Sequence, residues 1–358
     1  MKPNHVYVIA EAGVNHNGDL DLARALVDRA ADAGADAVKF QTFEAKKLAT
    51  LQAPKAGYQR ETTDAAESQL EMLRKLELPR AWHADLQERA RSRGIQFLST
   101  AFDSGSLDFL EEFDMPFYKV PSGELTNGPL LWQFARQRRP LVVSTGMATM
   151  SEVEQALAVI AHAFNADREP VDESAIWRGW SHPEWRASLR GRVTLLHCTS
   201  QYPTPMNEVN LKAMDTLAAF GLPVGYSDHT EGILIPVAAV ARGATLIEKH
   251  FTIDRAMPGP DHRASLEPGE LMLMIHQIRE LQLAMGDGAK CPQASEWNTR
   301  QAARQQVVAA RPIAAGAVLT REDLTTARCG YGVPAMSLWR LVGMTSRHDV
   351  GEGELLTL

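Results

Sequence analysis

The chain has 358 residues, of which 45% are hydrophobic and 23% charged, the composition of an ordinary globular protein. Its net charge of −7 argues against nucleic acid or an anionic membrane as the main partner. No apolar run approaches the roughly 20 residues of a membrane span, no signal-peptide pattern is present, and the three cysteines are too scattered for a disulfide framework. We therefore expect a cytoplasmic location.

Eight short, nearly continuous apolar segments punctuate the sequence up to Phe251. Segments of this length and character are typical of strands buried on both faces, which occur in parallel sheets. The predicted strands are Val6–Glu11, Ala37–Gln41, Gln96–Thr100, Phe117–Ser122, Leu141–Gly146, Val193–Thr199, Pro223–His229 and Thr245–His250.

Helical patterns alternate with these strands. They cover Leu20–Ala33, Pro79–Arg93, Ser106–Phe113, Pro129–Arg136, Ser151–His162, Leu211–Phe220, Ile233–Ala241 and Pro268–Ala284. Strand and helix alternating eight times predict a (β/α)8 TIM barrel, whose chemistry lies at the C-terminal ends of the strands. Because a bare barrel needs roughly 250 residues, a second, small domain is expected as well.

The sequence changes character after the last barrel helix. We assign residues 1–285 to the barrel, 286–300 to a linker with Gly, Pro and polar residues, and 301–358 to a small C-terminal domain. A domain of this size buries little core, so we expect it to lean on the barrel or on a second chain. Its predicted elements are a strand at Val307–Ala309, a helix start at Thr320–Leu324 capped by Thr320, and a helical turn at Ser337–Leu341.

One segment, Asn165–Arg190, falls outside the barrel pattern and contains Trp177, Trp180 and Trp185. It follows the fifth barrel helix and precedes the sixth strand, which places it at the end of the barrel away from the chemistry. We therefore interpret its tryptophans as packing or subunit-contact residues rather than as a binding site.

Polar side chains follow almost every predicted strand, and parallel strands of a barrel bring such residues to one mouth. Two lysines with several hydroxyls predict an anion site for phosphate or carboxylate. Two histidines from adjacent strands predict a divalent metal with open coordination positions, and nearby carboxylates predict a general base. The residues are Glu11, Lys39, Gln41, Thr100, Lys119, Ser122, Glu124, Ser144, Thr145, His197, Thr199, Ser200, Tyr202, Ser227, Asp228, His229, Glu248, Lys249 and His250.

Each of these groups also has a plainer interpretation. A lysine at a strand end is as often part of a structural ion pair, and His16 and His197 are expected to be hydrogen-bonded scaffold. Cys198 is expected to pack as a small hydrophobe rather than to act as a nucleophile. The convergence of all the groups on one mouth favours an active site.

Nine motifs, in order along nearly the whole chain, resemble the sialic acid synthase family, which includes N-acetylneuraminate, legionaminic acid and pseudaminic acid synthases. The tail is similar to the family's C-terminal antifreeze-like (SAF, β-clip) domain, whereas Asn165–Arg190 has no counterpart. The motifs are IAEAGVNHNGDL (Ile9–Leu20), AVKFQTF (Ala37–Phe43), STAFD (Ser99–Asp103), YKVPSGE (Tyr118–Glu124), STGMAT (Ser144–Thr149), HCTSQYPTP (His197–Pro205), GYSDHT (Gly225–Thr230), EKHFT (Glu248–Thr252) and PGPDHRASLEP (Pro258–Pro268).

The resemblance implies condensation of phosphoenolpyruvate with an open-chain N-acetylhexosamine, with release of phosphate. It further implies a divalent metal, Mn²⁺ or Mg²⁺, on His229 and His250, and a domain-swapped homodimer in which each tail covers the partner's barrel mouth. It assigns phosphoenolpyruvate binding to Lys39, Thr100, Lys119, Ser122, Ser200 and Ser227, sugar binding to Glu11, Gln41, Tyr202, Asp261 and Arg328, and catalysis to Glu124, Glu11 and Lys119, with Glu124 the candidate general base.

Two positions depart from the family pattern. Ser200 stands where the family often has Asn, and Cys329 stands where Pro usually follows the arginine matched by Arg328.

The sequence leaves the sugar open. N-acetylmannosamine is the first expectation, and a 2,4-diacetamido-trideoxyhexose, as used by legionaminic or pseudaminic acid synthases, is the alternative. The motif GPDHRASLEP is more similar to the neuraminate and legionaminate branches than to the pseudaminate branch. A catalytically silent sugar-binding barrel is a remote alternative, and the joint presence of Lys39, Lys119, Glu124, His229 and His250 argues against it.

Overall fold

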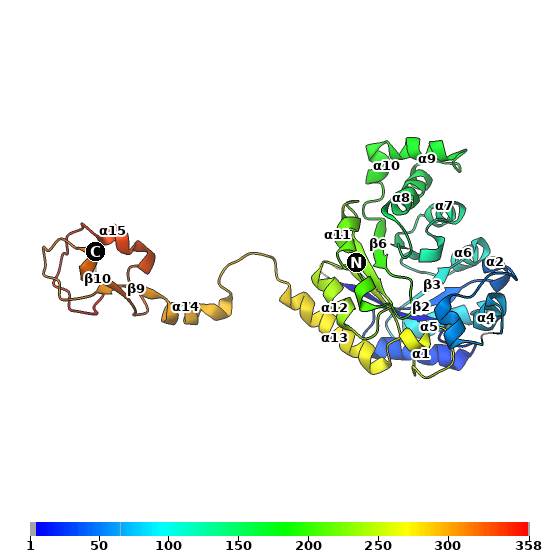
Figure 1. Ribbon diagram of the computed structural model, residues 1–358, viewed down its shortest axis with the longest axis horizontal. Helices are drawn as coiled ribbons and strands as arrows, with labels where there is room; N and C mark the ends of the chain where they lie inside the picture. Colours follow the sequence, from blue (N-terminus) through cyan, green and yellow to red (C-terminus); the bar gives the residue numbers. More distant parts are fainter. Residues whose placement is uncertain (1–4, 65, 357–358) are drawn as a thin grey trace. The chain divides into compact units, whose positions relative to one another are not determined.

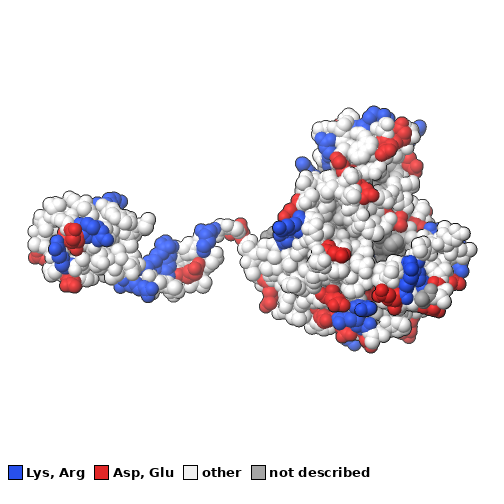
Figure 2. Space-filling view, in the orientation of Figure 1, with Lys and Arg blue, Asp and Glu red and all other residues white. Residues whose placement is uncertain are grey.

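The computed structural model describes residues 5–64 and 66–356. The chain divides into two compact units between Gly286 and Asp287, each of which is described by itself (Figure 1). No helix in the described part of the chain is both long and apolar enough to cross a membrane. Basic and acidic side chains are interspersed over the face of the first unit seen in Figure 2, without a broad patch of one sign.

The first unit is a barrel of eight parallel strands, as the sequence predicts. The strands are hydrogen-bonded in the order β3-β2-β1-β8-β7-β6-β5-β4, so that the barrel is nearly closed, with β3 and β4 at the two ends of the ladder. They are β1 (Tyr7–Gly13), β2 (Ala37–Thr42), β3 (Gln96–Ala101), β4 (Tyr118–Val120), β5 (Leu141–Ser144), β6 (Val193–Cys198), β7 (Val224–Asp228) and β8 (Leu246–His250).

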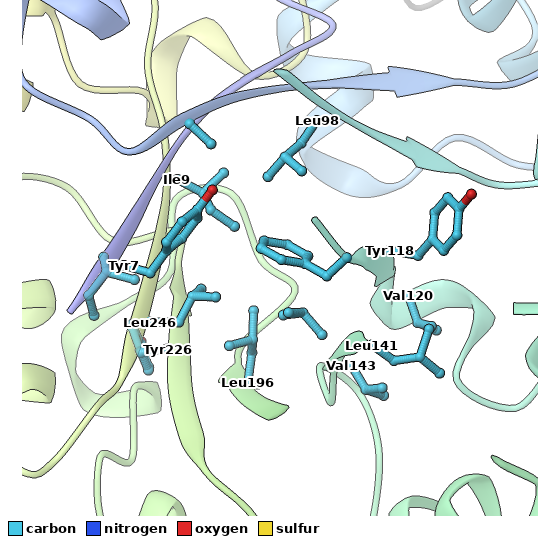
Figure 3. Close-up of a cluster of buried hydrophobic side chains, with 14 of the residues drawn as sticks. Tyr7, Ile9, Leu98, Tyr118, Val120, Leu141, Val143, Leu196, Tyr226 and Leu246 are labelled. Carbon is cyan, nitrogen blue, oxygen red and sulfur yellow. The ribbon is translucent and has the colours of Figure 1, made fainter. Parts of the chain in front are cut away.

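Side chains two residues apart on a strand lie on the same side, and this period separates core from chemistry inside the barrel. Ile9, Leu98, Leu196 and Leu246 belong to the buried apolar cluster of the barrel (Figure 3). Two residues further along the same strands stand Glu11, Thr100, Cys198 and Glu248, which line the cavity described below. The apolar layer thus forms the floor on which the polar residues stand.

The barrel helices begin where side chains cap their free backbone N–H groups. Asp19 caps α1, Asp103 caps α6 and Asn127 caps α7, while Thr149 and Glu152 form a capping box at the start of α8. The helices are α1 (Leu20–Asp32), α5 (His83–Ser92), α6 (Ser104–Leu110), α7 (Gly128–Arg136), α8 (Met150–Asn165), α11 (Ala213–Ala218), α12 (Leu234–Ala241) and α13 (Pro268–Ala284).

Residues 43–78 connect β2 to the helical segment that precedes β3. They form an excursion from the barrel with three short helices that the sequence does not predict. The helices are α2 (Ala45–Leu48), α3 (Gly57–Thr62) and α4 (Gln69–Leu76). A small apolar cluster that includes Val14, Phe43 and Met72 holds the excursion against the barrel. Buried Lys55 fastens it internally, since its Nζ donates to the Asp64 carbonyl at 2.8 Å and to Glu67 Oε1 at 3.2 Å.

The insertion Asn165–Arg190 folds into α9 (Glu173–Trp180) and α10 (Pro183–Ala187). Trp180 and Trp185 pack against the barrel core, and Trp180 Nε1 donates to Glu154 Oε1 on α8 at 2.8 Å. The interpretation as packing residues fits Trp180 and Trp185, whereas Trp177 is exposed.

The second unit has a small core of its own around an antiparallel pair, β9 (Gln305–Ala309) and β10 (Leu324–Arg328). It also contains α14 (Trp297–Ala303), which begins inside the segment that we predicted as linker, and α15 (Leu338–Leu341).

The helix start predicted at Thr320 forms, with Thr320 as its N-cap, but the helix does not continue. Only one 3-10 turn forms, Arg321–Asp323, and Leu324 already begins β10. Asp323 Oδ2 accepts hydrogen bonds from the backbone N–H and the hydroxyl of Thr320, at 2.7 Å each, as in a capping box. The helix stops after one turn because Leu324 pairs with Ala309 in the antiparallel ladder of β10 and β9.

Candidate active site at the barrel mouth

The polar ends of the strands surround a cavity of about 280 Å³. Most of the predicted site residues meet there, and all eight strands or the loops that follow them contribute to the lining. The cavity is lined by Glu11, Lys39, Gln41, Ala56, Tyr58, Thr100, Phe102, Lys119, Pro121, Ser122, Gly123, Ser144, Met147, Cys198, Ser200, Tyr202, Ser227, His229, Glu248 and His250.

Two lysines and two carboxylates form a buried charge cluster in this cavity. Lys39 Nζ lies 2.7 Å from Glu11 Oε2 and 3.5 Å from Glu248 Oε2, and it donates to Thr100 Oγ1 at 2.9 Å. Lys119 Nζ donates to Glu248 Oε1 at 2.9 Å. Strand register accounts for the first pair, since Glu11 and Lys39 are direct partners on β1 and β2, whereas Lys119 on β4 and Glu248 on β8 do not lie on neighbouring strands.

The two carboxylates have opposite pKa directions. Burial raises the pKa of the Glu11 carboxyl above its ordinary value, although Lys39 lowers it. Burial also acts upward on Glu248, but Lys119 and Lys39 together hold its pKa well below the ordinary range. Glu248 is therefore the permanent counter-charge of the lysines, and Glu11 is the carboxyl more ready to take up a proton.

A second group of cavity residues places serine hydroxyls next to the backbone at Gly146. Ser122 Oγ accepts the Gly146 N–H at 3.1 Å. A Cβ on Gly146 would lie only 2.2 Å from Ser200 Oγ and 2.7 Å from Ser122 Oγ, so glycine is needed for both hydroxyls to approach the backbone. Ser144 Oγ is buried and has no hydrogen-bond partner among the described residues. Hydroxyls and N–H groups of this kind suit the oxygens of a phosphate or carboxylate.

The two predicted metal ligands lie side by side, with ring centroids 5.4 Å apart. His229 Nδ1 lies 2.7 Å from the Thr199 carbonyl oxygen, so Nδ1 donates and Nε2 keeps its lone pair. His250 Nδ1 is buried without a hydrogen-bond partner among the described residues, and burial lowers the pKa of this imidazole well below its ordinary value. Burial acts downward on the pKa of His229, but Cys198 beside it raises that pKa above its ordinary value, so this imidazole would give up a proton on binding a metal. Imidazole nitrogens with available lone pairs fit a divalent metal.

Within residues 5–64 and 66–356, no three His, Cys, Asp or Glu side chains are grouped as a metal site. The predicted metal site therefore rests on the imidazoles of His229 and His250. His197 belongs to the scaffold instead, since its Nε2 is hydrogen-bonded to the Val209 carbonyl at 2.8 Å.

Most of the residues predicted to bind the sugar lie around the same two imidazoles. The Tyr202 ring lies 4.1 Å from the His229 ring, between centroids, and meets His250 edge-on at 5.6 Å. Gln41 Nε2 donates to Glu11 Oε1 at 3.2 Å. Buried Asp261 lies 3.8 Å from His250 Nδ1, and burial raises the pKa of its carboxyl to about 6.

Two residues to which the family resemblance assigns a role are not brought into this group. Glu124 is half-buried, accepts a hydrogen bond from Asn127 Nδ2 at 2.7 Å, and is absent from the described cavity lining. Arg328 ends β10 in the second unit, where its side chain is exposed. The roles of both residues stay predictions.

Three residues that are prominent in the structure, Glu248, Ser144 and Tyr58, have no role predicted from the sequence. Glu248 was named only as a strand-end residue, although its spacing of two from His250 on one strand already indicates that both face inward. The same spacing rule would have singled out Ser144. Tyr58 had no such signal, because it comes from the unpredicted excursion.

Known proteins match the chain over almost its whole length. The NeuB family model matches residues 26–290 and the SAF domain model residues 304–358. The chain is 47% identical to the N,N'-diacetyllegionaminic acid synthase of Campylobacter jejuni, over 98% of both proteins. It is 43% identical to the synthase of the same name from Legionella pneumophila, over 98% of this chain and 93% of that protein.

A solved structure, the N-acetylneuraminic acid synthetase of Leptospira borgpetersenii, matches with a TM-score of 0.66 at 33% identity, covering 82% of this chain and 90% of that one. The family model and the full-length relatives agree with the barrel, the tail and the charged mouth described above. The chain therefore belongs to the NeuB family of phosphoenolpyruvate-dependent, carbon–carbon bond-forming synthases and carries a C-terminal SAF domain.

Proposed function

We propose that this protein condenses phosphoenolpyruvate with a 2,4-diacetamido-trideoxyhexose and water to give N,N'-diacetyllegionaminic acid and inorganic phosphate. The pattern of similarity supports this sugar, with 47% and 43% identity to two synthases named for that product against 33% to the N-acetylneuraminic acid synthetase structure. N-acetylmannosamine, the first expectation from the sequence, becomes the less favoured substrate.

The buried charge cluster is the observation that carries the phosphoenolpyruvate half of this proposal. Among the described residues, Lys119 donates only to Glu248, and an ammonium group has three N–H donors, so two remain for a substrate oxygen. Lys39 is more fully engaged, with Glu11, Glu248 and Thr100 around it. Lys119 would therefore be the main direct contact to the anion, with Ser122, Ser144 and Ser200 completing the cradle.

The reaction balances as one condensation and one hydrolysis. C3 of phosphoenolpyruvate attacks the aldehyde carbon of the open-chain sugar, a carbon–carbon bond forms, and the aldehyde oxygen takes a proton. Water adds at the former C2 and loses one proton to give a hydroxyl. As the carbon–oxygen bond to phosphate breaks, this hydroxyl loses its proton, which the departing phosphate takes up, and a ketone is left. A divalent ion on His229 and His250 would supply Lewis-acid polarisation of the aldehyde oxygen.

Two carboxyl groups are candidates for the proton transfers. Glu124 is indicated by the family resemblance, while Glu11 lies in the cavity and has a raised pKa, which suits a group that exchanges protons near neutral pH. A tetrahedral adduct formed beside the hydroxyls of Ser122 and Ser200 would have donors for its phosphate oxygens as it departs.

Phosphate release with a panel of sugars tests the proposal. The purified protein is given phosphoenolpyruvate, Mn²⁺ or Mg²⁺, and in turn a 2,4-diacetamido-trideoxyhexose, N-acetylmannosamine or mannose, and products are identified by mass spectrometry. We expect the highest kcat/KM with the diacetamido sugar. A higher value with N-acetylmannosamine would restore the neuraminate assignment, and no phosphate with any sugar would favour the silent barrel.

A further inference from the structure

Tyr58 extends the ring stack that ends at the two predicted metal ligands. Its ring centroid lies 5.0 Å from that of Tyr202 at an interplanar angle of 31°, and Tyr202 in turn lies 4.1 Å from His229. Tyr58 also lines the cavity, together with its neighbour Ala56. The ring thus stands in the cavity wall one aromatic layer further from the imidazoles than Tyr202.

The segment that carries Tyr58 is fixed by several contacts. The residue lies on α3, within the excursion 43–78, which Lys55 fastens internally and a small apolar cluster holds against the barrel. The first turn of α3 is closed by Gln59, whose Oε1 accepts the Ala56 N–H at 3.0 Å. A ring held in this way loses little conformational entropy when a ligand packs on it.

The phenol group offers an unused donor. Gln59 Nε2 approaches the Tyr58 hydroxyl at 3.4 Å as a donor, and the phenol proton has no acceptor among the described residues. Burial raises the pKa of the phenol above its ordinary value and nearby Asp261 raises it further, so the hydroxyl stays protonated. A largely buried tyrosine hydroxyl usually has a partner, and a ligand oxygen would supply it here.

The position of Tyr58 in the stack of rings with Tyr202 and His229 determines which part of the sugar it contacts. The aldehyde carbon must lie beside phosphoenolpyruvate, near Lys119 and the imidazoles, so C4 to C6 extend away from them. In a 2,4-diacetamido-trideoxyhexose this end carries an acetamido group and a methyl group, whereas N-acetylmannosamine carries hydroxyls. An aromatic face with one donor matches two methyl groups and one amide carbonyl oxygen.

We infer that Tyr58 is a specificity-determining residue that packs on the C4–C6 end of the sugar and donates to its 4-acetamido oxygen. The inference rests on the proposed function and deepens it, because it assigns the choice between the two sugars to a residue on the unpredicted excursion.

The experiment compares the parent protein with Tyr58→Ala and Tyr58→Phe, using phosphate release with phosphoenolpyruvate and either sugar. For Tyr58→Ala we expect KM for the diacetamido sugar to rise about 10-fold or more, the low end of what small hydrophobic contacts contribute to selectivity. KM for phosphoenolpyruvate and KM for N-acetylmannosamine should stay within about twofold. Tyr58→Phe should show a smaller rise, because it keeps the ring and removes only the donor.

Glu61→Gln, at an exposed position of the same helix, is the matched control, and its constants should equal those of the parent. The parent's own sugar preference tests the proposed function separately, before any variant is compared. Parallel losses with both sugars, or a rise in KM for phosphoenolpyruvate, would make Tyr58 a mere support for Tyr202 and overturn the inference. Unchanged constants in both Tyr58 variants would overturn it as well.

Discussion

Glu248 Oε1 accepts a hydrogen bond from Lys119 Nζ at 2.9 Å within the barrel, where the two side chains are only 4% and 7% exposed. The same carboxylate accepts from Ser227 Oγ at 2.8 Å and lies 3.5 Å from Lys39. Removing one partner of a buried ion pair leaves an uncompensated charge and costs about 3–5 kcal/mol of stability. Glu248 is thus the counter-charge that keeps two lysines buried before an anionic substrate arrives.

Glu248→Gln should lower the melting temperature of the free protein. Phosphoenolpyruvate should then raise that temperature more in the variant than in the parent, because the bound anion supplies the missing negative charge. Thermal unfolding with and without phosphoenolpyruvate measures both effects, with exposed Glu231→Gln as the control. Equal melting temperatures and equal ligand shifts in variant and parent would contradict this role.

The metal prediction rests on the paired imidazoles. His229→Ala or His250→Ala should abolish metal binding and lower turnover by at least about 100-fold, in line with the loss of one key catalytic group. Metal content measured after dialysis and phosphate release measured with added Mn²⁺ check the two effects. His276→Ala, at an exposed position on α13, is the control. Full activity in excess chelator would remove the Lewis-acid contribution from the scheme.

Glu124 and Glu11 are the two candidates for the general base, and their variants distinguish between them. If the family resemblance holds for Glu124, Glu124→Gln should leave KM for phosphoenolpyruvate near the parent value and lower kcat, since it removes a proton acceptor and keeps the shape. The position of Glu11 in the cavity makes Glu11→Gln the comparison variant. Steady-state rates of both, measured as a function of pH, check the assignment. Parent-like turnover in Glu124→Gln together with a large loss in Glu11→Gln would move the base to Glu11.

Whether an element of this fold can be predicted from the sequence depends on what stabilises that element. The eight strands were predictable because burial on both faces leaves an apolar signature, and the period of two on β8 carries the positions of Glu248 and His250. The excursion 43–78 was not, because its helices are short and depend on tertiary contacts such as Lys55 with Glu67. The helix start at Thr320 was predictable from its capping pattern, but its end was not, because Leu324 pairs with Ala309, which is distant in the sequence.

A buried histidine outside the site gives a pH prediction. Burial lowers the pKa of His83 to about 4, and its Nε2 lies 2.7 Å from Thr42 Oγ1. Since the unfolded chain takes up this proton near pH 6.5, the contribution of neutral His83 to stability is present above that pH. It is lost as the pH falls through 6.5 toward 4, by about 3 kcal/mol for a shift of this size.

Urea unfolding at several pH values should therefore show a less steep acid-side loss in His83→Gln than in the parent. The substitution removes the titrating group, whatever packing it also disturbs at neutral pH. His276→Gln, where the ring is exposed, should keep the parent's slope. Identical slopes in His83→Gln and the parent would mean that other groups carry the acid sensitivity.

The last prediction concerns Arg328 and the assembly of the site. A unit as small as residues 287–358 has limited core, and the family resemblance places the tail arginine over a partner's barrel in a symmetric dimer. Lys39→Ala and Arg328→Ala should each inactivate the protein when made alone. Co-refolded as a mixture, they should regain activity at roughly one quarter of the sites, because each heterodimer then has one site with both residues intact. If Arg328 served its own barrel, every site in the heterodimer would keep one lesion, so absence of recovery from verified heterodimers would refute the swap.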